Sequence, residues 1–433
     1  MFEVKEKPRL VEKAFLLAVI VREDERDQAE SLLDELDELV SNLGIQVSQK
    51  KVVRVRKTFA RYLLGTGKLA EVLDEVKAAG CDVIIFDNEL SPSQQRNWEA
   101  ESNVLVIDRQ EIILDVFAAR AQTKEAVLQV KLARLEYSLP RLRRAWTHLG
   151  RQRGGGVTQR GEGEAQIELD QRMVRDQITA TKKEIKQVAK TRKTSRKRRL
   201  RIPLPTVALV GYTNAGKSTL LNRVCGSDVL SADKLFATLD PTSRQAQLPT
   251  GKRIILTDTV GFIRKLPHRL VEAFKATLEE VVEADLLIHV TDLSHPQVDE
   301  QIKAVNTVLE EIKAHEKPCM MVFNKIDQVE SSGIIEHYLE THGPAVAISA
   351  KSQQGFDSFL AELGTQLRPI RQFLELKIPQ EKTQVMARLY EVGQVEDRRF
   401  EGNDAFFIVR IPPQCHHEFE PYLLKDLEIA SND

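Results

Sequence analysis

Short hydrophobic runs alternate with amphipathic stretches in the first part of the chain, up to about residue 121. The runs AFLLAVIV, CDVIIFDN and NVLVIDR read as buried strands bounded by polar turns. Two stretches, SLLDELDELVSNLG and KLAEVLDEVKAAG, carry apolar residues at helical spacing and end at glycine. This alternation predicts an α/β domain over residues 1–121 with a mostly parallel sheet.

Residues 65–68 (GTGK) look like part of a phosphate-binding loop. The full pattern GxxxxGK would need glycine where Tyr62 stands, and no Ser or Thr follows Lys68. We interpret the segment as the start of a helix, with a second nucleotide or phosphate contact as the alternative.

The hydrophobic period changes at residue 122. Apolar residues then recur at alternating spacings of four and three, at Leu128, Leu132, Leu135, Leu139, Leu142, Trp146 and Leu149. After a glycine-rich loop the spacing returns at Val174, Ile178, Thr181, Ile185 and Val188. Two such seams predict an antiparallel coiled-coil hairpin over residues 122–202 with the loop at its tip. Pro140 should kink the first helix near its middle.

Alternating strand and helix patterns return at residue 203. TVALV, RIILTD, DLLIHVTD, CMMVFNK and AVAIS predict the strands of a second, mostly parallel sheet over residues 203–371. ELKIPQEK and AFFIVRIPP suggest a small α/β domain over residues 372–433. The predicted fold class is therefore α/β and multidomain.

Charge is strongly segregated along the chain, although the net charge of the 433 residues is only −1. Residues 122–201 hold 22 Lys/Arg and 8 Asp/Glu, a net of +14, which leaves 41 basic and 56 acidic groups, a net of −15, elsewhere. Such asymmetry indicates a module that faces a polyanion. The glycines and arginines in RQRGGGVTQRGEG indicate that the polyanion is a nucleic acid. The predicted RNA-binding residues are Arg151, Arg153, Gly154, Gly155, Gly156 and Arg160.

The remaining composition points to the cytoplasm. No apolar run approaches the roughly 18 residues of a membrane span, and the N-terminus lacks a signal-peptide core. The 4 cysteines lie far apart without a CxxC pair, which suits a reducing compartment.

The stretch GYTNAGKS, residues 211–218, matches GxxxxGK[ST] between a predicted strand and a predicted helix. Glycines let backbone N–H groups surround phosphate oxygens at the helix start. Lys217 is expected to reach the β- and γ-phosphates, and Ser218 to bind Mg²⁺.

Guanine is indicated by Asn324-Lys325-Ile326-Asp327, which follows the strand CMMVF. A carboxylate at Asp327 would accept bonds from guanine N1–H and N2–H₂, two donors that adenine lacks. Ser349-Ala350-Lys351, after the next strand, would contact the base through backbone N–H groups.

A switch is predicted at Asp258-Thr259-Val260-Gly261. Asp258 would hold Mg²⁺ through water and the Gly261 N–H would meet the γ-phosphate. Thr238 is the predicted second Mg²⁺ ligand, with Thr242 as the alternative. The predicted catalytic residues are Lys217, Thr238 and Gly261. The full set of predicted GTP-binding residues is Gly211, Tyr212, Thr213, Asn214, Ala215, Gly216, Lys217, Ser218, Phe236, Ala237, Thr238, Leu239, Asp240, Asp258, Thr259, Val260, Gly261, Asn324, Lys325, Ile326, Asp327, Ser349, Ala350 and Lys351.

Phe262 stands where many related enzymes place a water-orienting glutamine. An apolar ring cannot orient water, so unaided hydrolysis should be slow. A cation, another loop or a bound partner must then supply the missing group. Asn214 is a candidate K⁺ ligand, by resemblance to GTPases with asparagine at that position.

The chain resembles the HflX family of GTPases over nearly its whole length. The resemblance rests on GYTNAGKSTL, LFATLDPT, DTVGFIRKLPH, FNKID and the stretch WTHLGRQRGGGVTQRGEGEAQIELDQR. The family pattern GETQLE, followed by two arginines, appears here as GEAQIE and DQR, so a threonine and one arginine are replaced.

The resemblance implies a GTPase that binds the large (50S) ribosomal subunit and its ribosomal RNA, and that splits or rescues stalled ribosomes. We expect a monomer that uses Mg²⁺. One alternative is a non-hydrolysing, GTP-gated RNA-binding assembly factor, which Phe262 keeps open. Another is a partner in RNA modification, for which the sequence offers no cofactor site.

Overall fold

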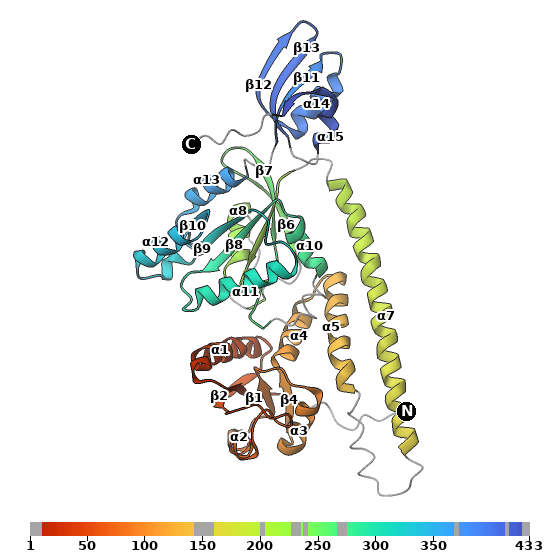
Figure 1. Ribbon diagram of the computed structural model, residues 1–433, viewed down its shortest axis with the longest axis vertical. Coiled ribbons are helices and arrows are strands. Elements are labelled where there is room, and N and C mark those ends of the chain that lie inside the picture. The colour runs from red at the N-terminus through yellow and green to blue at the C-terminus, as the bar shows by residue number, and fades with distance from the viewer. Residues whose placement is uncertain are drawn as a thin grey trace. The chain divides into compact units, whose positions relative to one another are not determined.

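The computed structural model describes residues 11–142, 160–199, 204–226, 235–236, 241–265, 275–367, 372–411 and 415–426. It contains three separate sheets (Figure 1). By Cα proximity the chain forms two compact units. The first comprises Met1–Gln187, Ala232–Asp240 and Arg264–Phe274, and the second comprises Val188–Ser231, Pro241–Ile263 and Lys275–Asp433.

The first unit is built on a four-stranded parallel sheet with the strand order β2-β1-β3-β4. Helices α1 and α4 contact each other, whereas α2 and α3 share a core with the sheet around Trp98 (Figure 1). The elements are β1 (Lys13–Ile20), η1 (Glu23–Glu25), α1 (Arg26–Asn42), β2 (Gln46–Arg54), α2 (Thr66–Ala79), β3 (Val83–Phe86), α3 (Pro92–Ser102), β4 (Leu105–Asp108), α4 (Arg109–Arg120) and α5 (Lys124–Leu142).

The three predicted strands of this unit are confirmed, and GTGK indeed starts helix α2. Strand β2 was not predicted from the sequence, because it is an edge strand with mostly polar residues, QVSQKKVVR. Helix α3 was not predicted either, because its sequence, PSQQRNWEAES, has little apolar periodicity. Its start is nevertheless marked by a capping box in which Ser91 accepts from the Gln94 N–H.

Helix α7 (Arg160–Arg199) carries the second predicted seam. Thr181 is buried, and Val174, Ile178, Ile185 and Val188 are half-buried among exposed neighbours. Lys182 of α7 pairs with Glu136 of α5 at 2.8 Å. The described part of α5 ends two residues after Pro140, and the predicted positions Trp146 and Leu149 lie outside the described residues.

The second unit holds a six-stranded sheet with the order β10-β9-β8-β5-β7-β6. All its pairings are parallel except β6 with β7, so the mostly parallel prediction is confirmed. Its elements are β5 (Thr206–Gly211), α8 (Lys217–Cys225), β6 (Thr242–Gln247), β7 (Arg253–Asp258), α10 (Lys275–Glu283), β8 (Leu286–Asp292), α11 (Val298–Glu311), β9 (Cys319–Asn324), η4 (Ile326–Gln328), α12 (Ser332–Thr341), β10 (Ala345–Ala347) and α13 (Phe356–Gln366).

The C-terminal residues form an antiparallel sheet with the order β12-β13-β11-β14. Along β13, buried residues alternate with half-buried ones, so one face of the sheet packs on a core. The elements are β11 (Gln372–Pro379), α14 (Thr383–Val392), β12 (Gln394–Glu401), β13 (Asp404–Ile411), α15 (His416–Phe419), η6 (Glu420–Tyr422) and β14 (Leu423–Asp426).

Candidate nucleotide site and switch region

The predicted phosphate loop leaves the end of strand β5 and enters helix α8. Gly211 and Gly216 have φ angles of +150° and +95°, and a Cβ at Gly211 would overlap the carbonyl oxygen of Val290 on β8. Asn214 also has positive φ, at +61°. The loop therefore depends on glycine at its two ends, where backbone N–H groups would face phosphate.

Lys217 lies inside the loop and is only 6% exposed. Its Nζ donates to the carbonyl oxygens of Gly211, at 3.1 Å, and Tyr212, at 2.7 Å. Burial lowers the pKa of Lys217 to about 8, although the charge of Asp258 opposes this shift. The ammonium group is thus held at the centre of the predicted phosphate cradle.

Ser218 and Asp258 meet beside the loop. The Ser218 hydroxyl donates to Asp258 Oδ2 at 2.6 Å, and Asp258, at the end of β7, is 1% exposed. A hydroxyl and a carboxylate that lie together are oxygen donors of the kind that Mg²⁺ prefers, so these residues fit the ion. The other predicted ligand, Thr238, lies outside the described residues.

The switch segment is bonded to the phosphate loop through the backbone of Phe262. Its N–H donates to the Gly211 carbonyl at 3.1 Å, and its carbonyl accepts from the Thr213 N–H at 2.7 Å. A Cβ at Gly261 would lie 2.7 Å from the Thr213 Cα and 3.1 Å from Lys217 Nζ. The Phe262 side chain is apolar and buried, so it cannot orient a water molecule.

Asn324 joins the predicted guanine motif to two other segments. Its Nδ2 donates to the Ala215 carbonyl at 2.8 Å, and its Oδ1 accepts from the Ala350 N–H at 2.9 Å. Lys325 has a φ of +64° and its Nζ pairs with Asp292 at 2.7 Å. Asp327 in η4 is exposed, as a carboxylate that receives a base must be.

Two of the backbone N–H groups predicted to contact the base, those of Ser349 and Ala350, donate to acceptors within the protein. The Ser349 N–H donates to the Gln354 carbonyl at 3.0 Å, and the Ala350 N–H donates to Asn324. Base contacts by these amides stay a prediction. The bridging role of Asn324 was not inferred from the sequence, because it depends on three segments meeting in space.

The comparisons with known proteins agree with this geometry. The family model described as 50S ribosome-binding GTPase matches residues 206–325, and the models for the N-terminal and middle regions of a GTP-binding GTPase match residues 30–118 and 120–199. A GTPase HflX of Akkermansia muciniphila is 45% identical, with 98% of this chain and 99% of the relative covered. GTPase HflX of Escherichia coli is 42% identical over 93% of this chain and 94% of that protein.

The chain belongs to the HflX family of GTPases. As an HflX GTPase it binds GTP and GDP and hydrolyses GTP, and the six-stranded sheet with its phosphate loop is the GTPase domain. GTPase domains of this kind generally use Mg²⁺ with the nucleotide. Within the described part of the chain, no helix has the length and apolar character to cross a membrane.

The residues after the DTVG motif of this HflX GTPase are held by the first unit. The Arg264 guanidinium donates to Ser31 Oγ at 3.0 Å and pairs with Glu35 at 3.3 Å. Lys265 pairs with Asp87, which follows β3. Both carboxylates also pair with the buried Arg109. The segment predicted to act as a switch therefore leads into a cluster of buried charges.

Most of the predicted GTP-binding residues around Thr238 of this HflX protein lie outside the described residues. Ala237, Thr238, Leu239 and Asp240 are in that group. Phe236 is described and packs edge-to-face on Phe117 of α4, with ring centroids 4.5 Å apart. Its ring is 1% exposed, so the structure gives it a core position in the first unit, and any nucleotide contact stays a prediction.

The predicted RNA-contacting tip lies mostly outside the described residues, including Arg151, Arg153, Gly154, Gly155 and Gly156. Arg160 is the first residue of α7, and its side chain is likewise not described.

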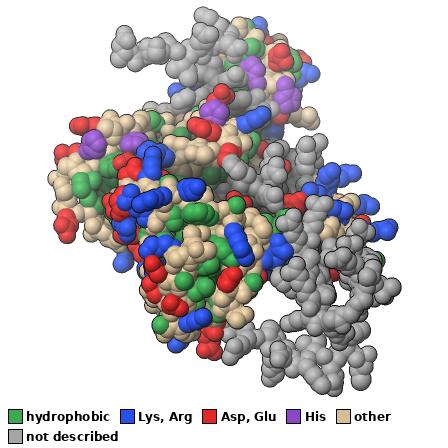
Figure 2. Space-filling view, turned by 60° about the horizontal axis from the view of Figure 1, so that its bottom comes forward, with side chains coloured by type: hydrophobic (Ala, Val, Ile, Leu, Met, Phe, Trp, Pro, Cys, Tyr) green, Lys and Arg blue, Asp and Glu red, His purple; other side chains and the backbone are tan. Residues whose placement is uncertain are grey.

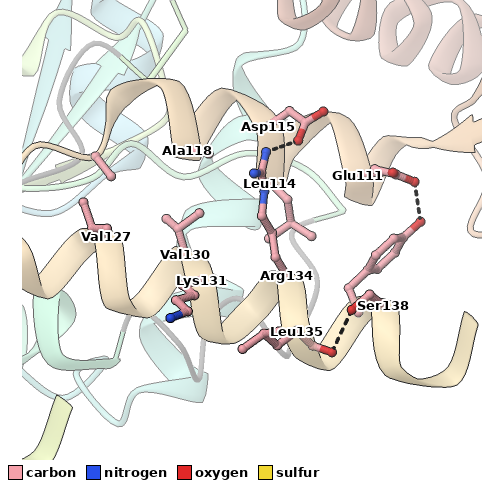
Figure 3. A pocket seen from close by; sticks show the side chains of 12 residues that line it. Glu111, Leu114, Asp115, Ala118, Val127, Val130, Lys131, Arg134, Leu135 and Ser138 are labelled. Atoms are coloured by element: carbon pink, nitrogen blue, oxygen red, sulfur yellow. Dashed lines mark hydrogen bonds and ion pairs between the residues drawn. The ribbon is translucent and has the colours of Figure 1, made fainter. Parts of the chain in front are cut away.

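A cavity of about 560 Å³ lies between α4 and α5 in the first unit (Figure 3). Apolar side chains such as Leu114 and Val130 line it together with an Arg134–Asp115 ion pair. At one end the Tyr137 hydroxyl lies 3.2 Å from Glu111, and burial, reinforced by Asp108 and Asp115, raises the pKa of Glu111 to about 7. The described residues that line this cavity all belong to α4, α5 and the link between them.

Proposed function

We propose that the GTP state of this HflX GTPase binds the large ribosomal subunit through its basic hairpin, and that hydrolysis releases it. Binding in this state would split or rescue stalled ribosomes. The observation that carries the proposal is the covalent continuity from Gly261, beside Lys217, to Arg264 in the charge cluster of the first unit. Loss of the γ-phosphate could then change the conformation of the first unit, which contains most of the basic segment.

The basic segment supplies the partner chemistry. Residues 122–201 carry a net charge of +14, and the least exposed positions of α7 follow the predicted seam. A hairpin formed by α5 and α7 would present Arg151, Arg153 and Arg160 at its tip. Guanidinium groups bind phosphate bidentately and stack on bases, and glycines allow close approach to RNA.

The nucleotide would sit with its phosphates on residues 211–218 and its base on Asp327. Ser218, Thr238 and, through water, Asp258 would hold Mg²⁺, which neutralises charge that develops on the phosphates. Phe262 provides no water-orienting group, so we propose that K⁺ at Asn214 or the bound ribosome completes the site. Asn214 is exposed at the rim of the loop, where a cation can reach it.

The scaffold alternative loses its main support, because the family consists of GTP hydrolases. Phe262 is then a reason for slow hydrolysis without a partner. Turnover that rises when ribosomes are added would agree with this interpretation.

Cosedimentation with separated ribosomal subunits tests the proposal. The native chain should pellet with large subunits in a non-hydrolysable GTP analogue and much less in GDP. Replacing Arg151, Arg153 and Arg160 with alanine should weaken this association and lower its salt dependence, with basal GTP hydrolysis retained. Equal binding in GTP analogue, GDP and no nucleotide would show that the proposed coupling is absent.

A further inference from the structure

A basic loop of the N-terminal unit, residues 56–61 (RKTFAR), lies outside the hairpin and the nucleotide site. It belongs to a stretch from residue 50 to residue 68 that holds 7 Lys/Arg and no Asp or Glu. On the face drawn in Figure 2, Lys and Arg side chains lie among exposed hydrophobic ones. All six residues of the loop are exposed.

The cations of this stretch fall into two groups. Lys50, Lys51, Arg54 and Lys68, outside the loop, form ion pairs with acidic residues of the same unit. Arg56, Lys57 and Arg61 form no ion pair with any described residue. Arg61 lies over the Tyr62 ring, 5.0 Å from its centroid, but no described carboxylate neutralises any of the three charges. Three cations this close together favour an anionic partner.

An exposed aromatic ring stands among these cations. Phe59 is 42% exposed, and Lys57 Nζ lies 5.7 Å from its ring centroid. The ring rests against Gly65, where a Cβ would meet Phe59 at 3.7 Å. The edge atoms Cε2 and Cζ of the ring lie toward Gly65, and the exposed part of the ring is accessible to a ligand.

The loop is held in a defined shape. Phe59 and Leu63 exchange two backbone hydrogen bonds, at 3.2 and 2.8 Å, and Leu63 has a φ of +64°. Asn97 Nδ2 donates to the Arg61 carbonyl at 3.0 Å, and Trp98 Nε1 donates to the Tyr62 carbonyl at 2.9 Å. Because α3 fixes the backbone in this way, the main chain of the loop needs little ordering on binding.

We infer that this loop is a second RNA-binding surface, which stacks an unpaired base on Phe59 and binds the flanking phosphates through Arg56, Lys57 and Arg61. Single-stranded RNA offers both a splayed base and a phosphate chain, whereas an acidic peptide offers charge without the base. The surface extends the proposed function, because ribosomal RNA would be the partner, but it uses residues distinct from the hairpin tip.

Fluorescence anisotropy of the full-length protein with an unstructured single-stranded RNA of about 20 nucleotides tests the inference. Arg56→Gln/Lys57→Gln/Arg61→Gln should weaken binding and reduce the slope of log K against log salt by about 2, since each phosphate contributes about 0.7. The matched control, Lys77→Gln/Lys313→Gln/Lys382→Gln, removes the same charge from exposed sites outside the loop and the hairpin and should leave the slope unchanged.

Phe59 has its own test. Phe59→Leu keeps an apolar contact with Gly65 but removes the ring, and should weaken RNA binding by about 5- to 100-fold without a change of slope. Phe59→Trp should restore binding. Unaltered thermal unfolding and basal GTP hydrolysis would show that the variants fold.

Each loop variant is also measured with Arg151, Arg153 and Arg160 replaced by alanine. If the two surfaces act separately, their losses of binding free energy should add. If only the loop variants lose RNA, the hairpin proposal fails and this inference stands. If the loop variants bind RNA as the control does, or lose only a poly-glutamate probe, the inference is wrong.

Discussion

Asn324 Nδ2 occupies the position that a Cβ of Gly216 would need, and it donates to the carbonyl of the adjacent Ala215. The predicted base-binding and phosphate-binding segments of the GTPase domain thus share one buried hydrogen bond. Both segments must keep their relative position for nucleotide to bind, which makes Gly216 a sensitive site.

Gly216→Ala should therefore impair nucleotide binding. The new methyl group would overlap Asn324 Nδ2, and alanine is strained at a φ of +95°. Affinity for fluorescent GDP should fall by at least about tenfold, equivalent to about 1.4 kcal/mol. Gly67→Ala is the control, because its Cβ would meet open space. Unchanged affinity in Gly216→Ala would contradict the described loop geometry.

Asp327→Asn should shift base preference from guanine toward xanthine nucleotides. An amide presents a donor where guanine also presents donors, so one hydrogen bond becomes a repulsion. Charge-assisted bonds contribute roughly 1.5–3 kcal/mol each, so the loss of GDP affinity should exceed tenfold. Competition between GDP and XDP for the protein measures the preference. A variant that still selects guanine would refute the role of Asp327.

Arg264→Ala should destabilise the first unit. Arg264 is 7% exposed, and its loss leaves Glu35 with less compensation in a buried cluster. Breaking a buried pair costs roughly 3–5 kcal/mol. Urea unfolding followed by Trp98 fluorescence, with Trp146 replaced by Phe, reports on this unit. Lys265→Ala is the comparison: that side chain is 45% exposed, so it should have a clearly smaller effect.

Glu111→Gln should change how stability depends on pH. The pKa of Glu111 is raised to about 7 by burial, so the folded state holds this proton more tightly than the unfolded state, whose value is 4.5. The stabilisation is complete below the unfolded pKa and is lost as pH rises through about 7.

Glutamine keeps the site neutral at every pH. The variant should be more stable than the native chain by up to roughly 3 kcal/mol near pH 8, and the difference should vanish near pH 4. Denaturant unfolding at several pH values measures this. Glu89→Gln, at an exposed position, should leave the profile unchanged. A Glu111→Gln profile parallel to the native one would show that Glu111 titrates normally.

The sequence predicted the elements whose signal is local. Apolar runs gave β1, β5 and β8, and the phosphate loop and guanine motif follow from residue order alone. Strand β2 was missed because its outer edge is solvated and its residues are mostly polar. Contacts such as Arg264 with Glu35 join positions 229 residues apart, and no local pattern encodes them.

Phe262 illustrates the same limit at the site. Its apolar side chain predicts slow hydrolysis. In the structure, its backbone N–H and carbonyl form the hydrogen bonds to the phosphate loop. Every residue type except proline can form these main-chain hydrogen bonds, so the sequence does not indicate them. The bonds between the predicted switch segment and the phosphate loop are visible only in the structure.

The two main-chain hydrogen bonds of Phe262 have a mechanical consequence. With its N–H and carbonyl both committed to the phosphate loop, Phe262 makes the strand end and the cradle move as one body. Flexing must then occur in the next two peptide links, between Phe262 and Arg264. We expect so short a link to pass a displacement of the phosphate loop on to Arg264 along the chain itself.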